Sequence, residues 1–124
     1  MVRVRQTAER SGRTVEEVRV VAISKTKPFS LIRQVYDSGH RCFGENYVQE
    51  ILQKAPQLPN GIEWHFIGHL HSNKVKSLMV PNISMVEGVH NEKIANHLDN
   101  AVSSLARNPL KVLVQVNTSG EPCE

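Results

Sequence analysis

The chain has 124 residues, of which 40% are hydrophobic and 22% are charged, a composition typical of a globular protein with one modest core. Its net charge of +3 comes from basic residues that are interspersed with acidic ones, so no basic block predicts nucleic-acid binding. No apolar run approaches the ~20 residues of a membrane span, and two cysteines do not suggest a disulfide framework. We therefore expect a cytosolic protein with neither a membrane nor a nucleic-acid partner.

The N-terminal segment MVRVRQTAERSGR is rich in arginine, but Glu9 interrupts it and a helical pattern continues beyond it. We expect a helix over Val4–Val18, weakened by Ser11 and Gly12. A mitochondrial transit peptide is the alternative that this arginine-rich start leaves open.

Five short apolar runs are predicted to be buried strands, and helical patterns follow them. The strands are Val18–Ser24, Arg41–Gly44, Glu63–Gly68, Ile83–Val86 and Lys111–Val116. The helices are Pro28–Ser38, Glu45–Lys54, Leu70–Met79 and Asn91–Ala106. This alternation predicts an α/β fold with a parallel sheet and right-handed crossovers, because parallel neighbours cannot be joined by a tight turn.

Two architectures fit this order of elements, an open doubly wound sheet and a closed (β/α) barrel. A full barrel of eight units takes ~250 residues, so this chain would hold about half of one. The sequence ends at Glu124, just beyond the last predicted strand. We therefore expect a single partial domain over residues 1–124, with about five strand–helix units of a truncated fold.

The segment VVAISKTKP, residues 20–28, carries an apolar strand directly into Lys25. An amine at the mouth of such a strand is expected to be partly desolvated, which disfavours the ammonium form and makes the free base available for a Schiff base with an aldehyde. The alternative is that Lys25 and Lys27 are two solvated loop lysines without chemistry.

Ligands bind at the carboxyl ends of the strands in both architectures. The predicted strands run there into polar residues, namely Lys25, Glu45 with Asn46, His69, Glu87, and Asn117 with Thr118. An amine, an amide and further hydrogen-bonding groups on one rim favour a small-molecule site.

The segment FGENYVQE follows the second strand. Gly44 would let a flat ligand approach the backbone, and the amide of Asn46 would reach such a ligand. The alternative is that Asn46 caps the following helix. Glu45 and Glu50 are expected to favour the N-terminus of that helix or to face solvent, rather than to form a catalytic pair.

The segment WHFIGHLHSNK is rich in histidine, but His65 lies within the predicted strand whereas His69 and His71 follow it. No cysteine or aspartate completes a ligand set there, so no metal site is predicted. We expect Trp64 to lie in the core, and His65 to lie in the core or to support a neighbouring site residue without contacting a ligand itself. Strained Gly-Ser-Gly elbows, Walker patterns and dinucleotide fingerprints are all absent from the sequence, so hydrolysis by a serine and nucleotide binding are not predicted.

Four segments in this order resemble the pyridoxal phosphate homeostasis protein family: VVAISKTKP, RCFGENYVQE, EWHFIGHLHSNK and VLVQVNTSGE. The resemblance runs from about Val4 to Glu121 and implies a barrel of the alanine-racemase type. It implies that Lys25 holds pyridoxal 5′-phosphate as a Schiff base and that Asn46 lies at the cofactor. It also implies a cytosolic, mostly monomeric cofactor carrier or regulator of vitamin B6, without enzymatic turnover.

The sequence departs from the family pattern at two points. His71 stands where the family often has glutamine, a change expected to be mild. After NTSGE the family continues with further strand–helix units that include its phosphate-binding loops, whereas this sequence ends at Glu124. We therefore expect Lys25 to form the imine but to hold the cofactor weakly.

Two alternatives to the carrier stay open. One is an amino-acid racemase-like enzyme that uses pyridoxal phosphate, for which the sequence shows no second acid–base group. The other is a fragment that binds no cofactor and self-associates through its exposed strand edges.

Overall fold

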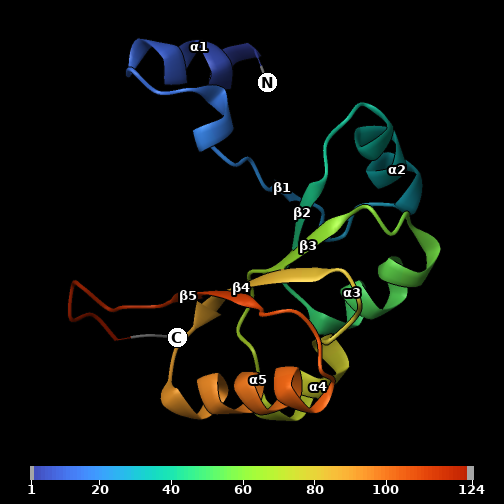
Figure 1. Ribbon diagram of the computed structural model, residues 1–124, viewed down its shortest axis with the longest axis vertical. Coiled ribbons are helices and arrows are strands. Elements are labelled where there is room, and N and C mark those ends of the chain that lie inside the picture. Colours follow the sequence, from blue (N-terminus) through green and yellow to red (C-terminus); the bar gives the residue numbers. More distant parts are fainter. Residues whose placement is uncertain (1, 123–124) are drawn as a thin grey trace.

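A computed structural model describes residues 2–122 of the chain. Five parallel strands form one sheet in the order β1-β2-β3-β4-β5 (Figure 1). The strands are β1 (Ala22–Ile23), β2 (Cys42–Glu45), β3 (Glu63–Phe66), β4 (Ile83–Val89) and β5 (Lys111–Val114). Each strand pairs with the next one along the chain, as in a barrel, whereas a doubly wound sheet reverses its order at a switch point. The predicted α/β class with the strand order of a parallel barrel is confirmed.

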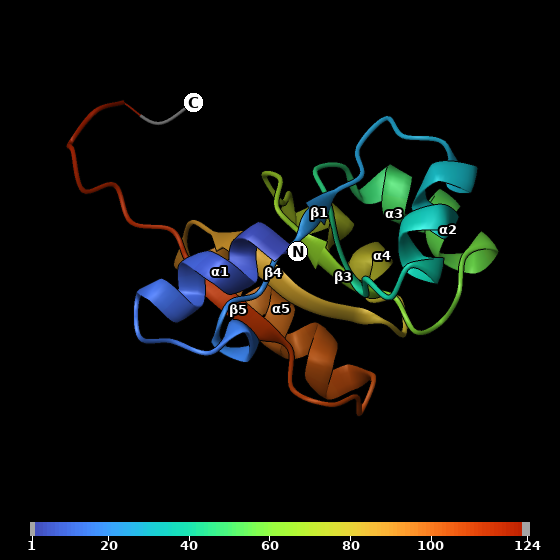
Figure 2. The same ribbon diagram turned by 90° about the horizontal axis from the view of Figure 1, so that it is seen from above.

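Helices connect the successive strands and follow one another along one side of the sheet (Figure 1). These helices are α2 (Phe29–Asp37), α3 (Val48–Lys54), α4 (Val75–Leu78) and α5 (Glu92–Ser104), with the 3-10 turns η2 (Ala55–Gln57) and η3 (Ser72–Lys74) beside α3 and α4. Helix α1 (Val2–Arg10) and the turn η1 (Val15–Glu17) precede the sheet, and α1 lies on its opposite side (Figures 1 and 2). None of the helices within residues 2–122 combines the length and the apolar character needed to cross a bilayer.

The hydrophobic core lies between the sheet and helices α2 to α5. Its largest side chains are those of Phe43, Trp64 and Phe66, which are almost completely buried. Burying a side chain of this size contributes roughly 1.5–3 kcal/mol to folding. The predicted core position of Trp64 is confirmed.

The other side of the sheet carries the alternate residues of the strands, because successive side chains point to opposite faces. We call this side the inner face. It is formed by Ile23, Cys42, Gly44, Glu63, His65 and Ile67.

Two strands differ in length from the prediction, because pairing with a neighbouring strand determines where a strand ends. Only Ala22 and Ile23 of the first predicted strand pair with β2, opposite Phe43 and Gly44. Strand β4 continues to Val89, so Glu87 lies within the strand and not beyond its end.

The helix boundaries also differ from the prediction. The first helix ends at Arg10, and the chain turns at Gly12 with a φ of +73°. Helix α3 begins after the expected start, because Glu45 continues β2. The predicted helix Leu70–Met79 is reduced to η3 and α4. Helix α5 begins where expected, because Oδ1 of Asn91 accepts a hydrogen bond from the backbone N–H of Ile94 at 2.9 Å.

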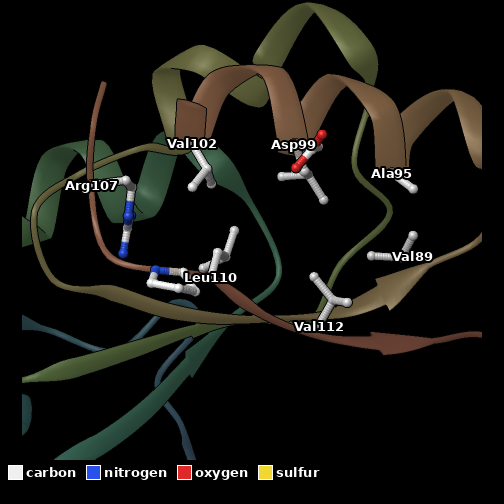
Figure 3. Close-up of a pocket in the computed structure, with 9 residues that line it drawn as sticks. Val89, Ala95, Asp99, Val102, Arg107, Leu110 and Val112 are labelled. Atoms are coloured by element: carbon white, nitrogen blue, oxygen red, sulfur yellow. The ribbon is translucent and has the colours of Figure 1, made fainter. Parts of the chain in front are cut away.

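Strand β5 forms an open edge of the sheet. Its residues Val112, Leu113 and Val114 are exposed, as is Val116 beyond it. A hollow with mainly apolar walls, to which Leu110 contributes, lies between α5 and strands β4 and β5 (Figure 3). Unpaired edge strands are templates for association, and the expected self-association stays a prediction for this edge.

Glycine is required at position 68, where the chain leaves β3. A Cβ atom there would overlap the backbone oxygen of Asn46, whereas a Cβ at Gly88 would meet its nearest neighbour, the Gly68 oxygen, at an ordinary 3.5 Å. The close passage of backbone past Gly68 therefore sets the position of Asn46.

We expect Gly68→Ala to lower the free energy of unfolding by about 1–3 kcal/mol, because the Asn46 backbone would have to move. Gly88→Ala is the matched control and should change it by less than about 0.5 kcal/mol. Urea denaturation of both variants checks this. Equal effects of the two substitutions would contradict the role given to Gly68.

Candidate functional site

The register of β1 and β2 brings Lys25 and Asn46 to neighbouring positions at the carboxyl end of the sheet. Ile23 pairs with Gly44, and the backbone N–H of Ser24 donates to the Gly44 oxygen at 3.0 Å. Lys25 and Asn46 each lie two residues beyond that pair. Both lie beyond the ends of their strands, Lys25 in the turn after β1 and Asn46 in the bend after β2.

The side chain of Lys25 is exposed, which corrects the expectation that it is desolvated. Strand β1 has only 2 residues, and Lys25 lies in the turn after it. Within residues 2–122 its amine makes no hydrogen bond or ion pair. Lys25 differs from an ordinary surface lysine in its position and in how its turn is held.

A buried ionic cluster holds that turn. The Nζ atom of Lys54 donates to Oε1 of Glu45 at 2.6 Å, to the backbone oxygen of Ser24 at 2.8 Å and to Oε1 of Glu50 at 3.2 Å. Oε1 of Glu50 also accepts from the backbone N–H of Thr26 at 2.8 Å. We call these five residues the Lys54 cluster. Because Ser24 and Thr26 flank Lys25 and are bound through backbone atoms, the cluster fixes the backbone of the turn.

The turn needs such support because Thr26 has a φ of 59°, in the left-handed region. A β-branched residue rarely adopts this conformation, which costs of order 1–3 kcal/mol. The hydrogen bond from Thr26 to Glu50 helps to offset that cost.

Glu45 corrects a second expectation, because it is buried in β2 and neither begins a helix nor faces solvent, whereas Glu50 lies in the first turn of α3 as expected and also joins the Lys54 cluster. Burial raises the pKa of Glu45 above its ordinary value, and this effect outweighs the hydrogen bonds from Lys54 and Ser24. Burial also acts to raise the pKa of Glu50, but the hydrogen bonds from Thr26 and Lys54 bring it below the ordinary value.

Asn46 does not cap helix α3, so the capping alternative is wrong. The N-cap position belongs to Tyr47, and no side-chain cap bond is made there. Asn46 is half-buried, and within residues 2–122 its amide has no hydrogen-bond partner. It lines a shallow hollow together with His69, His71 and Lys74.

Gly44 does not offer bare backbone to a ligand, as the sequence led us to expect. A Cβ atom at Gly44 would collide with the side chain of Ile67 and would lie 2.9 Å from Cδ1 of Ile23 and 3.1 Å from Cγ1 of Val21. These aliphatic side chains cover the glycine.

The histidines divide between two places. The ring of His69 lies 4.9 Å from that of His71 and 4.1 Å from that of His90, centroid to centroid, at the carboxyl end of the sheet. His90 was missed because β4 was expected to end before it. His65 is buried within β3, as predicted, and its Nδ1 lies 2.7 Å from Oε1 of Glu87. Glu87 therefore partners His65 and is not a rim residue.

We expect Lys54→Met to lower the free energy of unfolding by about 3–5 kcal/mol, because it leaves Glu45 buried without its partner. The double variant with Glu45→Gln should recover much of that loss. Lys74→Met, at an exposed lysine, is the control and should have little effect. Urea denaturation at pH 7 measures all of them, and a double variant no more stable than Lys54→Met would rule out the pairing.

The Glu50 carboxylate gives the stability a defined pH dependence. Its pKa is lower in the folded state than the ~4.3 of an unperturbed glutamate. The ionised Glu50 carboxylate therefore contributes fully to the free energy of unfolding above pH ~4.3, and this contribution is lost as the pH falls through the pKa of the folded state. Glu50→Gln should cost about 1–3 kcal/mol at pH 7 and clearly less at pH 3. Glu9→Gln, at an exposed position of α1, serves as the control, and a pH-independent effect of Glu50→Gln would refute this role.

No protein-family model matches the chain. Curated relatives named "Pyridoxal phosphate homeostasis protein" include that of Mus musculus, 46% identical over 96% of this chain and 47% of the relative, and that of Vibrio alginolyticus, 45% identical over 95% and 52%. The chain thus spans about half the length of the curated relatives it matches.

Solved structures agree with these relatives. PipY of Synechococcus elongatus, solved with PLP bound, is 34% identical, with a TM-score of 0.77 over 94% of this chain and 55% of that one. An unknown protein from Bifidobacterium adolescentis is 29% identical, with a TM-score of 0.84 over 98% of this chain and 53% of that one. Over almost its whole length, the chain therefore resembles the pyridoxal phosphate homeostasis proteins, as its four sequence motifs predict.

Proposed function

We propose that this chain binds pyridoxal 5′-phosphate at the carboxyl end of the sheet, with Lys25 holding it as a Schiff base and Asn46 contacting it. The observation that carries the proposal is the matched position of these two residues, each two residues beyond the pair Ile23 and Gly44. The cofactor bound to PipY and the names of the curated relatives support the same ligand.

The chemistry of the two side chains fits the aldehyde and ring end of this cofactor. Pyridoxal phosphate supplies an aldehyde, which condenses with a primary amine with loss of water. The amine of Lys25 and the amide of Asn46 have no partners within residues 2–122, so neither must break an existing hydrogen bond to meet a ligand. The Lys54 cluster keeps the Lys25 backbone in place, which limits the entropy lost on binding.

We infer that the chain serves as a cytosolic cofactor carrier in pyridoxal phosphate homeostasis and not as an enzyme. The names of the relatives denote homeostasis and no reaction. A reversible imine suits a protein that delivers its ligand.

Reductive trapping tests the assignment of the lysine. The chain is incubated with pyridoxal phosphate and reduced with borohydride, and the modified residue is located by mass spectrometry. We expect modification at Lys25 well above that at Lys27, an exposed lysine two residues away and therefore a matched control. Lys25→Ala should abolish the imine absorbance band, and Lys27→Ala should keep it.

Asn46→Ala should weaken cofactor binding by up to about tenfold, as expected for one lost hydrogen bond. Equal labelling of Lys25 and Lys27, or an unchanged band in Lys25→Ala, would overturn the assignment. Release of the α-proton of alanine by the loaded protein would instead support the racemase-like alternative.

A further inference from the structure

Three potential metal ligands converge at the other end of the inner face. Cys42 and Glu63 begin β2 and β3 and pair directly across the two strands. His65 lies two residues after Glu63, on the same face. One ligand atom from each of the three residues lies within 4.8 Å of the others, and Sγ of Cys42 is 3.1 Å from Oε2 of Glu63.

His65 is prepared to act as a ligand. Its side chain is only 1% exposed, and its Nδ1 is bonded to Glu87 at 2.7 Å, whereas its Nε2 is buried and has no hydrogen-bond partner within residues 2–122. A buried nitrogen left without a partner costs about 1–3 kcal/mol. Histidines that bind metals typically donate their other ring N–H to a carboxylate, which fixes the tautomer. The Glu87 carboxylate is placed to accept this bond from Nδ1, and in that tautomer the Nε2 lone pair is available to a metal.

We propose that Cys42, Glu63 and His65 bind a zinc ion at the amino end of the inner face, with Glu87 positioning His65. Thiolate, imidazole and carboxylate are the donors that zinc uses in proteins. Bond lengths of ~2.0–2.3 Å at tetrahedral angles place the ligand atoms ~3.3–3.5 Å apart, so ligand atoms that lie within 4.8 Å of one another need to approach by at most about 1.5 Å. The fourth position would hold water.

The site can be reached from solvent, and zinc would replace the proton of the Cys42 thiol. Glu63 is exposed and Cys42 half-buried, so the site opens to solvent. Burial and the hydrogen bond to Glu63 raise the pKa of the Cys42 thiol to about 11, although the charge of Arg19 acts the other way. Zinc binding breaks the S–H bond, forms a Zn–S bond and releases one proton, with no oxidation or reduction.

Zinc titration of the metal-free chain, followed by competition with a chromophoric chelator, tests the proposal. We expect one zinc ion per chain, with the affinity at least tenfold lower in Cys42→Ser and in Glu63→Gln. Cys123→Ser is the matched control for the thiol. His71→Ala and Lys25→Ala are controls for the carboxyl end, and none of these three should change the affinity.

Cobalt substitution gives a readout that a purely structural role would not alter. The cobalt-loaded chain should show a thiolate-to-cobalt charge-transfer band that is lost in Cys42→Ser while circular dichroism shows the fold retained. Unchanged zinc affinity in Cys42→Ser, or zinc lost only in His71→Ala, would overturn the proposal. No binding at all would leave the two hydrogen-bonded pairs as structural contacts and would equally overturn it.

Discussion

The carboxyl end of the sheet depends on a lysine that has almost no contact with solvent. Lys54 is 3% exposed and binds Glu45, which is 0% exposed. Removing two charges from water costs several kcal/mol each, and their attraction repays this only when the geometry is good and further hydrogen bonds are made. The bonds of Lys54 to the Ser24 backbone and to Glu50 are such additional bonds. The pair therefore contributes a unique geometry more than net stability, and it joins the end of β1, the end of β2 and the last turn of α3.

Two lysines have different roles in this arrangement: Lys54 holds the turn, and Lys25 is free to react. The amine of Lys54 is engaged by three oxygen acceptors, so it is not available to react. Lys25 has none of these partners, but its backbone lies between the two residues that the cluster holds. An exposed amine on a fixed backbone combines access for a small aldehyde with a defined position, which burial alone would not provide. The expectation that desolvation activates Lys25 is replaced by this positional account.

The sequence was sufficient to predict the strands and helices, which follow from local periodicity. It was insufficient to predict strand lengths and contacts between strands, which depend on register. Apolar runs followed by amphipathic helices predicted five parallel strands but left open a doubly wound sheet or a barrel, and the family resemblance indicated the barrel order that is observed. The length of β1 could not be predicted, because it depends on which residues pair with β2, and only Ala22 and Ile23 do so. Glu45 and Lys54 lie nine residues apart, at what looked like the two ends of one helix, and each end matched the usual preference for its charge. Only the extension of β2 through Glu45 turns that carboxylate toward the lysine.

The same limit explains why the candidate metal ligands were not recognised. Cys42 and Glu63 are separated by 21 residues, and His65 and Glu87 by 22, so no motif within one segment contains either pair. In the histidine-rich segment, the other candidate ligands near His65 in sequence are His69 and His71. Their rings lie with His90 at the other end of the sheet. The alignment of three parallel strands, and not spacing along the chain, brings thiol, carboxylate and imidazole together.

The inner face thus has polar chemistry at both ends and an aliphatic layer between them. Val21, Ile23 and Ile67 cover Gly44 midway along β2, between Cys42 and Asn46. Gly44 leaves the space that these side chains fill, and any Cβ there would push Ile67 and Ile23 away from the sheet. Because the layer is apolar, charges at one end have no hydrogen-bonded route to the other. A Schiff base at Lys25 and a cation near Cys42 would therefore lie on opposite sides of these aliphatic side chains, with no shared hydrogen-bonding group between them.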